Sequence, residues 1–123
     1  AMDLTEEWDK VAAPGSLVQG CVVVRSQFAQ EHPEELKVFL EEYEASINAL
    51  TADVQASAEK IEATGVFAKG AVAAKAIPNC NLCFITGADM EPALGQFLEI
   101  MHGVAPASVG GAVPGADFYC VLE

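Results

Sequence analysis

The sequence predicts a helix-rich α/β fold with two or three strands and about four helices. A β-branched apolar run over residues 17–24 is typical of a strand that is buried on both faces. Over residues 33–50, apolar side chains recur at steps of three and four, as they do on one face of an amphipathic helix. The length of 123 residues, of which 52% are hydrophobic, fits one domain or a piece of a larger one.

The charged N-terminal stretch, residues 3–16, comes first. We expect one helical turn from Thr5 to Trp8. Pro14-Gly15 then predicts a turn, because this dipeptide breaks regular structure.

Three segments are predicted as strands. The first is the run over 17–24, where Gly20 marks a bulge or a close backbone approach. Residues 82–86 have the composition of a second buried strand. Residues 118–121 are expected to form a short last strand.

The first long helix is predicted over residues 33–50. Pro33 suits the first helical position, and the acidic residues Glu34 and Glu35 favour the positive end of the helix dipole. The apolar stripe of this helix consists of Leu36, Phe39, Leu40, Tyr43, Ile47 and Leu50.

Two further helices are predicted before the second strand. One covers residues 52–63, with Thr51 as its N-cap and Gly65 as the left-handed residue after its end. A short Ala-rich helix covers 68–76 and stops before Pro78, because the residue before a proline disfavours helical geometry.

The fourth helix is predicted over residues 89–102, with Asp89 as its cap and Gly103 at its end. Residues 104–117 are rich in Ala, Gly, Pro and Ser and are expected to form a loop.

These strands are too few for an ordinary sheet, which usually has four to six. A strand as apolar as residues 17–24 requires neighbours on both edges. We therefore expect either that the chain associates with a second copy or that the neighbouring strands belong to another part of a larger protein.

The charge excludes nucleic acid as a partner. There are 18 acidic against 6 basic residues, and the basic ones are scattered, whereas phosphate binding requires clustered Lys and Arg. No apolar run approaches the roughly 18 residues that would span a bilayer. The acidic N-terminus lacks the positive and apolar regions of a signal peptide.

The cysteines are too few for a disulfide scaffold and are expected to pack as small apolar side chains: Cys21, Cys80, Cys83 and Cys120. Cys80 and Cys83 form a Cys-x-x-Cys pair, which suggests a redox pair or half a zinc site. The pair leads into a predicted strand, and neither His32 nor His102 stands at ligand spacing, so packed thiols are favoured. A Cys21–Cys80 disulfide is a third interpretation for an exported protein.

Catalytic groups are not indicated. The glutamates at 34–35 and 41–44 fall on or beside the solvent face of the predicted helix, whereas catalytic carboxylates are usually buried or paired in a cleft. His32 and His102 stand at helix ends and have no Ser or Cys partner at a recognisable spacing. We expect no enzyme activity, no cofactor and no metal site.

Polar residues at two predicted strands are the candidate ligand contacts: Gln19, Gly20, Asn79 and Asn81. Amides at strand ends in α/β sheets often contact a ligand in the adjacent crevice. The competing interpretation for the two asparagines is turn chemistry.

An ordered series of motifs resembles the second half of bacterial ABC-transporter substrate-binding proteins, in the branch that binds nitrate, taurine, sulfonates and thiamine-precursor pyrimidines. The series comprises a V-x-R-x-x-F step at 23–28, an H-P-E helix start at 32–34 and an F-L-x-x-Y helix at 39–43. The stretches 76–85 and 110–119 extend the likeness over most of residues 3–121.

The resemblance implies that residues 1–123 are one fragment, the C-terminal part of a two-lobe protein with the type II periplasmic-binding-protein fold. It implies a small organic or anionic solute and an ABC permease as partners, and it leaves a homodimer of the fragment open. It also implies an extracytoplasmic location, with a lipoprotein anchor in the full-length form. A fragment without the first half cannot close on a ligand.

Two alternatives stay open beside this one. The first is a stand-alone α/β interaction domain that completes its sheet by dimerisation. The second is an enzyme of thiamine-pyrimidine synthesis on the same fold, which would require a histidine in a cleft-facing strand.

Overall fold

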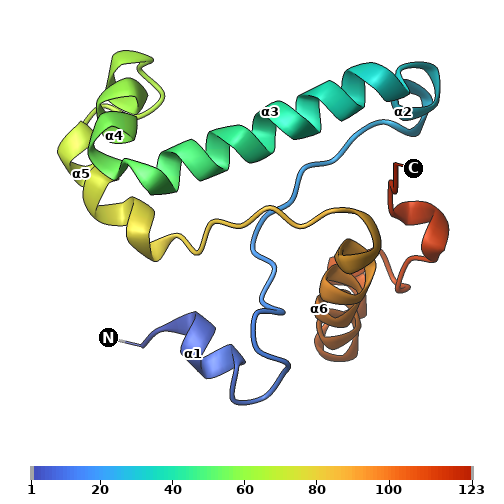
Figure 1. Cartoon of the computed structure of the whole chain (residues 1–123). Coiled ribbons are helices and arrows are strands. Elements are labelled where there is room, and N and C mark those ends of the chain that lie inside the picture. The colour runs from blue at the N-terminus through green and yellow to red at the C-terminus, as the bar shows by residue number, and fades with distance from the viewer. Residues whose placement is uncertain (1, 123) are drawn as a thin grey trace. The chain divides into compact units, whose positions relative to one another are not determined.

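The computed structural model describes residues 2–122 and is built from helices joined by extended segments and turns (Figure 1). No β-strand occurs among the described residues, so the predicted α/β class, with its partial periplasmic-binding-protein lobe, is wrong for them. The α-helices are α1 (Leu4–Trp8), α2 (Ser26–Glu31), α3 (Pro33–Ala52), α4 (Val54–Ala63), α5 (Gly70–Ala76) and α6 (Met90–Val104). The 3-10 helices are η1 (Ile77–Asn79), η2 (Gly87–Asp89), η3 (Pro106–Val109) and η4 (Ala116–Phe118).

The described chain divides into two compact units. Unit 1 combines the residues up to Glu31 with those from Ile85 onward, and it contains α1, α2, α6 and three 3-10 helices. Unit 2 spans His32–Phe84 and contains α3, α4, α5 and η1.

The long helix α3 confirms the helix predicted over 33–50. Pro33 occupies its first turn together with Glu34 and Glu35, as expected from the dipole. The apolar stripe is largely uncovered, however, because only Leu36 of its members is buried. Phe39 and Tyr43 stack with ring centroids 5.7 Å apart, yet they remain 44% and 39% exposed.

Helix α4 confirms the second predicted helix but begins later. Its N-cap is Asp53, whose carboxylate accepts a 3.0 Å hydrogen bond from the backbone N–H of Ala56. The predicted cap Thr51 lies inside α3, where its hydroxyl donates to backbone carbonyls of the preceding turn. Gly65 adopts the expected left-handed conformation, with φ of 73°.

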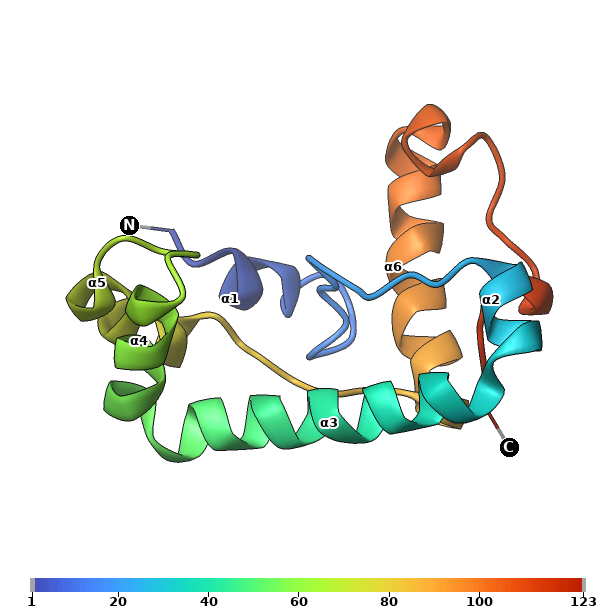
Figure 2. The same cartoon turned by 90° about the horizontal axis from the view of Figure 1, so that it is seen from above.

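Helix α5 confirms the predicted Ala-rich helix, and Pro78 falls in η1 directly after it. The only cluster of buried apolar residues in the described chain is formed where α4, α5 and η1 meet, as Figure 2 shows for the two helices. Its members are Ala58, Ala73 and Ile77, and the partly buried Leu50, Val54, Ile61 and Ala74 pack against them.

In unit 1, the N-terminal helical turn is confirmed as α1, with Asp3 as its N-cap. The ring of Trp8 packs against Phe97 of α6 at 5.5 Å between centroids. The indole N–H of Trp8 donates a 2.8 Å hydrogen bond to the buried hydroxyl of Ser16. This contact anchors α1 and the Pro14-Gly15 turn, whose Gly15 has φ of 79°.

Helix α6 confirms the fourth predicted helix, with two corrections at its ends. Asp89 stands at the N-cap but its side chain forms no capping hydrogen bond, and Gly103 lies inside the last turn instead of ending the helix.

The predicted strands are wrong at all three places. Residues 17–24 and 82–86 are extended but unpaired. Of the third segment, Phe118 ends η4, and residues 119–121 follow it without forming a strand. A helix satisfies its backbone hydrogen bonds internally, whereas a strand depends on a neighbour to complete the ladder. Among residues 2–122, no extended backbone supplies that ladder.

Candidate functional site

The four predicted ligand contacts fall in both units. Gln19 and Gly20 are exposed in the extended segment of unit 1. Asn79 and Asn81 are exposed in unit 2, directly before the second extended segment.

The two asparagines have local structural roles that match turn chemistry. The side-chain amide of Asn79 donates a 3.1 Å hydrogen bond to the carbonyl of Lys75 and so caps the end of α5. Asn81 has φ of 49°, and it is the only residue other than glycine at positive φ among residues 2–122. Asparagine tolerates this conformation better than most side chains.

Asn81 also borders a small hollow of unit 2. The hollow has a volume of about 250 Å³ and is lined by Thr51, Val54, Ile77, Pro78, Asn81 and Leu82. Most of this lining is apolar, and Asn81 supplies its one amide. The hydroxyl of Thr51, the other polar side chain of the lining, donates within α3.

A larger groove of about 360 Å³ lies in unit 1, between one face of α6 and the segment that leads to Tyr119. Figure 2 shows this segment returning alongside α6. Glu91, Gly95 and Glu99 succeed one another at four-residue steps on α6 and share one face. The hydroxyl of Tyr119 lies over the middle of this face, 3.4 Å from the place where a Cβ on Gly95 would stand.

Burial and nearby negative charge in this groove favour the neutral form of the Tyr119 phenol. Burial raises the pKa of Tyr119, and the negative charges of Glu91 and Glu99 raise it further. The lining includes no cationic side chain; its remaining members are Pro92, Gln96, Val113, Pro114, Gly115 and Ala116. The groove therefore offers two carboxylates and a phenol to hydrogen-bond donors.

This groove was not predicted from the sequence. The four-residue spacing of Glu91, Gly95 and Glu99 was readable as one helix face. The position of Tyr119 over this face was not predictable, because the loop between α6 and Tyr119 has no pattern that fixes where the chain returns.

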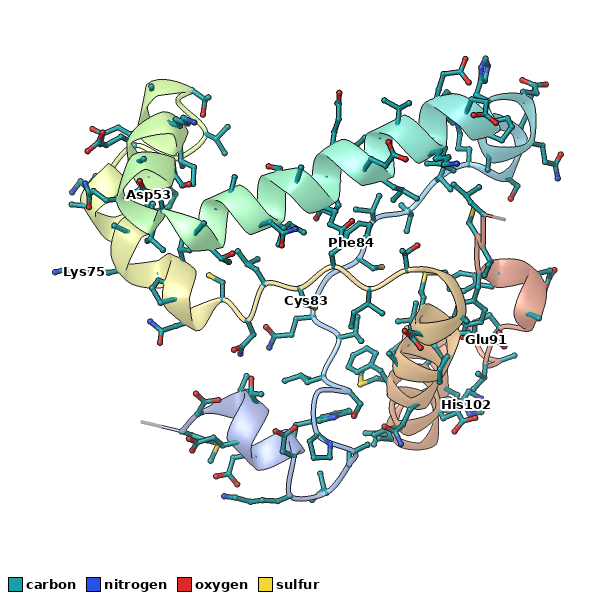
Figure 3. All side chains as sticks on the ribbon, in the orientation of Figure 1. Asp53, Lys75, Cys83, Phe84, Glu91 and His102 are labelled. Carbon is teal, nitrogen blue, oxygen red and sulfur yellow. The ribbon has the colours of Figure 1, made fainter. Side chains whose placement is uncertain are left out.

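The cysteines do not pack as expected. All four are free thiols; Cys21, Cys80 and Cys83 are exposed and Cys120 is half-buried. The thiol of Cys80 donates to the carbonyl of Ala76 at 3.2 Å, while Cys83 follows on extended chain (Figure 3). The apolar surroundings expected for the cysteines depended on a sheet, and no sheet occurs among residues 2–122.

Neither histidine belongs to the hollow or the groove. The Nδ1 atom of His32 lies 3.3 Å from the carboxylate of Glu35. The pKa of Glu35 is lowered, mainly by a hydrogen bond from its own backbone N–H and then by His32. His102 sits in the last turn of α6, as expected from the helix dipole, with Nε2 3.3 Å from the carbonyl of Gly111.

Neither a metal-binding cluster nor a membrane-spanning helix occurs within residues 2–122. No group of three or more His, Cys, Asp or Glu side chains there is arranged to hold a metal ion. None of the helices described combines the length and apolar character that crossing a bilayer requires.

Comparison with models of protein families, with curated proteins and with solved structures finds no match to this chain.

Proposed function

We propose that this chain is part of an extracytoplasmic solute-binding protein of an ABC importer, and that this protein captures a small organic or anionic solute for its permease. The motif series that resembles such proteins suggests the class. The observation that carries the proposal is the state of the two apolar extended segments, residues 17–24 and 82–86, which lack backbone partners in the described chain.

The positions of the acidic residues support burial of both segments against other protein. The chain carries 18 acidic residues, yet none falls within residues 10–30 or 63–88, the two longest runs without Asp or Glu. Each run contains one of the extended segments. Carboxylates are costly to bury, so a stretch that packs against other protein is expected to exclude them.

The small amount of buried apolar surface points the same way. Only four apolar residues of the described chain are buried, and no large side chain is fully buried. The exposed ones include Val22, Val23, Phe39, Leu82 and Ile85. A self-sufficient domain of this length normally buries a larger core, so these side chains fit a surface that the rest of a protein covers.

Within the proposed function, Asn81 is the best-supported ligand contact of the four predicted residues. It combines an exposed amide with a place in the lining of the unit 2 hollow. Gln19 and Gly20 remain proposed contacts on the extended segment of unit 1. The alternative of a pyrimidine-synthesis enzyme gains no support, because neither histidine lines the hollow or the groove.

The first test is to read the coding sequence upstream of Met2. We expect an open frame that adds a further lobe and begins with an export signal of the lipoprotein type. A stop codon in frame just before Met2 would overturn the proposal.

The second test is binding by the protein that the whole gene encodes. Nitrate, taurine, an alkanesulfonate and a thiamine-precursor pyrimidine are added separately, and the melting temperature is followed. A ligand at a hundred times its Kd stabilises the folded state by about 2.7 kcal/mol, which is a readily measured rise. Failure of all four solutes to raise the melting temperature would contradict the proposal.

A matched variant connects the binding to the site. Asn81→Gly removes the amide but keeps the left-handed backbone, since glycine adopts positive φ without strain. We expect the ligand-induced rise, measured from the variant's own melting temperature without ligand, to fall. Asn48→Ala, which removes a side-chain amide of α3 that is outside the hollow's lining, is the control that should retain the rise.

A further inference from the structure

The groove of unit 1, between α6 and the segment that leads to Tyr119, carries two negative charges at separate points. Glu91 lies in the first turn of α6, where Figure 3 labels it, and Glu99 lies on the same face, two turns further along. This spacing corresponds to about 12 Å along the helix axis. The lining of the groove includes no Lys, Arg or His that could balance the two charges.

Both carboxylates lack a partner among residues 2–122. Neither Glu91 nor Glu99 forms an ion pair or a side-chain hydrogen bond there. The ion pairs of the described residues lie elsewhere, between Lys10 and Glu7 and between His32 and Glu35. Two unpaired carboxylates attract a cation, and the net charge of −12 strengthens this attraction.

The spacing of the two carboxylates disfavours a compact cation as their common ligand. A Ca²⁺ or Mg²⁺ ion needs several oxygen ligands within about 2.0–2.6 Å. Among residues 2–122, no three His, Cys, Asp or Glu side chains gather in an arrangement that could hold a metal ion. An extended ligand with a positive charge at each end can instead contact Glu91 and Glu99 together.

Between the two charges, the groove presents a phenol over an open part of the helix face. Gly95 places no side chain there, and the hydroxyl of Tyr119 lies 3.4 Å from the place where a Cβ on Gly95 would stand. Tyr119 is half-buried, and the neutral form of its phenol is favoured. Since a neutral phenol oxygen accepts a hydrogen bond from an N–H group, the middle of the groove suits an amine within a chain.

The remaining lining suits the hydrocarbon links of such a chain. Pro92 on α6 contributes apolar surface, as do Val113, Pro114 and Ala116 on the segment that leads to Tyr119. Methylene groups gain free energy when such surface removes them from water. The groove volume of about 360 Å³ lies in the range of small-molecule sites.

We infer that this groove binds a linear polyamine, with its terminal ammonium groups at Glu91 and Glu99 and an inner amine at the hydroxyl of Tyr119. A polyamine combines the three features that the groove selects: two separated positive charges, an N–H donor between them and methylene links. This inference concerns the groove of unit 1. It does not rest on the proposed solute capture, whose best-supported contact lies in unit 2.

Calorimetric titration of the chain at pH 7 and low salt tests the inference with three amines. Spermidine has two terminal amines and one inner amine. Octamethylenediamine has the same length with a carbon in place of the inner nitrogen, and butylamine has a single charge. We expect the Kd to be lowest for spermidine and higher for octamethylenediamine, and we expect no saturation with butylamine. No saturable binding of spermidine at millimolar concentration, or equal binding of butylamine, would overturn the inference.

Glutamate variants separate the groove from the overall charge of the chain. Glu91→Gln and Glu99→Gln are each expected to raise the Kd for spermidine about fivefold, the upper end for an exposed ion pair. Glu42→Gln removes the same charge from an exposed position on α3, outside the groove, and should leave this Kd unchanged. Equal increases for all three variants would mean attraction by overall charge alone and would refute the site.

Tyr119→Phe tests the position of the inner amine. The variant keeps the ring and removes only the hydroxyl. We expect it to raise the Kd of spermidine to that of octamethylenediamine and to leave the Kd of octamethylenediamine unchanged. A preference for spermidine that survives this change would contradict the contact with Tyr119.

Nuclear magnetic resonance locates the binding. The backbone amide of Gly95 is expected to shift as spermidine is added, whereas that of Gly70, in unit 2, should not. Shifts at Gly70 without shifts at Gly95 would place the ligand outside the groove and refute the inference. None of these results alters the outcome expected from the coding sequence or from the solute panel, so the two proposals fail separately.

Discussion

The carboxylate of Glu62 accepts a 2.7 Å hydrogen bond from the backbone N–H of Gly70, and this bond joins the end of α4 to the start of α5. The first N–H groups of a helix have no partner within it, and the positive end of its dipole favours a carboxylate. Lys69, at the N-cap position of α5, provides no side-chain cap. Glu62 therefore takes the capping role from eight residues upstream.

Glu62→Ala is expected to lower the free energy of unfolding by about 1 kcal/mol, the usual effect of losing a helix cap. Urea unfolding followed by far-ultraviolet circular dichroism measures it. Glu59→Ala is the control, since Glu59 lies on the same helix and bonds only to the exposed amide of Gln55. Equal losses for both variants would contradict the capping role.

Gly70→Ala is expected to destabilise the chain by about 1–3 kcal/mol, because it forces extra volume into a close contact. A Cβ on Gly70 would lie 3.0 Å from the carbonyl oxygen of Ala58 and closer still to the Glu62 carboxylate. Gly103→Ala, in the last turn of α6, meets open space and should instead stabilise by about 0.5–1 kcal/mol through helix propensity. Unfolding curves that move in the same direction for both variants would refute this contrast.

Ser16→Ala is expected to cost about 1–3 kcal/mol, because the part-buried indole N–H of Trp8 loses its acceptor. Trp8 is the only tryptophan, so its fluorescence reports the site directly. We expect the emission to shift to longer wavelength as α1 loosens. The Ser16 hydroxyl also donates to the carbonyl of Ala13 at 2.6 Å. Ser108→Ala removes a similar hydroxyl-to-carbonyl bond at an exposed position, without an indole partner, and should change neither stability nor emission. An unchanged emission for Ser16→Ala would show that this bond does not hold Trp8 in place.

Tyr119 is expected to ionise above its ordinary pKa of 10, because burial and the charges of Glu91 and Glu99 disfavour the phenolate. A raised pKa in the folded state means that the stabilisation is complete below pH 10 and is lost as pH rises through the folded value. Ultraviolet titration of the Tyr43→Phe variant isolates Tyr119. Glu91→Gln in that background should lower the midpoint. A midpoint at or below 10 in the parent would contradict this account of the groove.

The helices α1, α3, α4, α5 and α6 were predictable because their signals are local, whereas α2 was not predicted. Pro33, Gly65 and Pro78 mark helix boundaries through constraints on their own backbone or on that of a neighbour, and α3, α4 and α5 begin or end close to them. The error at Thr51 has a local reason as well, since its hydroxyl bonds back into α3 and leaves the cap to Asp53.

The candidate sites were predictable only in part. Asn81 was selected from its position before an apolar segment; it borders a hollow, and its role as a ligand contact stays a prediction. The groove of α6 was missed, because it depends on where the chain returns Tyr119 after a loop without a pattern. The link between Glu62 and Gly70 was missed for the same reason: it depends on how two helices pack.

By itself, the sequence determined where five of the six α-helices of residues 2–122 form, all but α2, since each α-helical hydrogen bond joins residues four apart and the residues that begin or end a helix act within one turn. Only the tertiary structure decided whether residues 17–24 and 82–86 pair as strands. They have strand composition but remain unpaired among the described residues. A strand takes its hydrogen bonds from a remote segment or another chain, so its own residues cannot establish that a partner is present. That difference separates the confirmed helices from the sheet that was predicted and is not there.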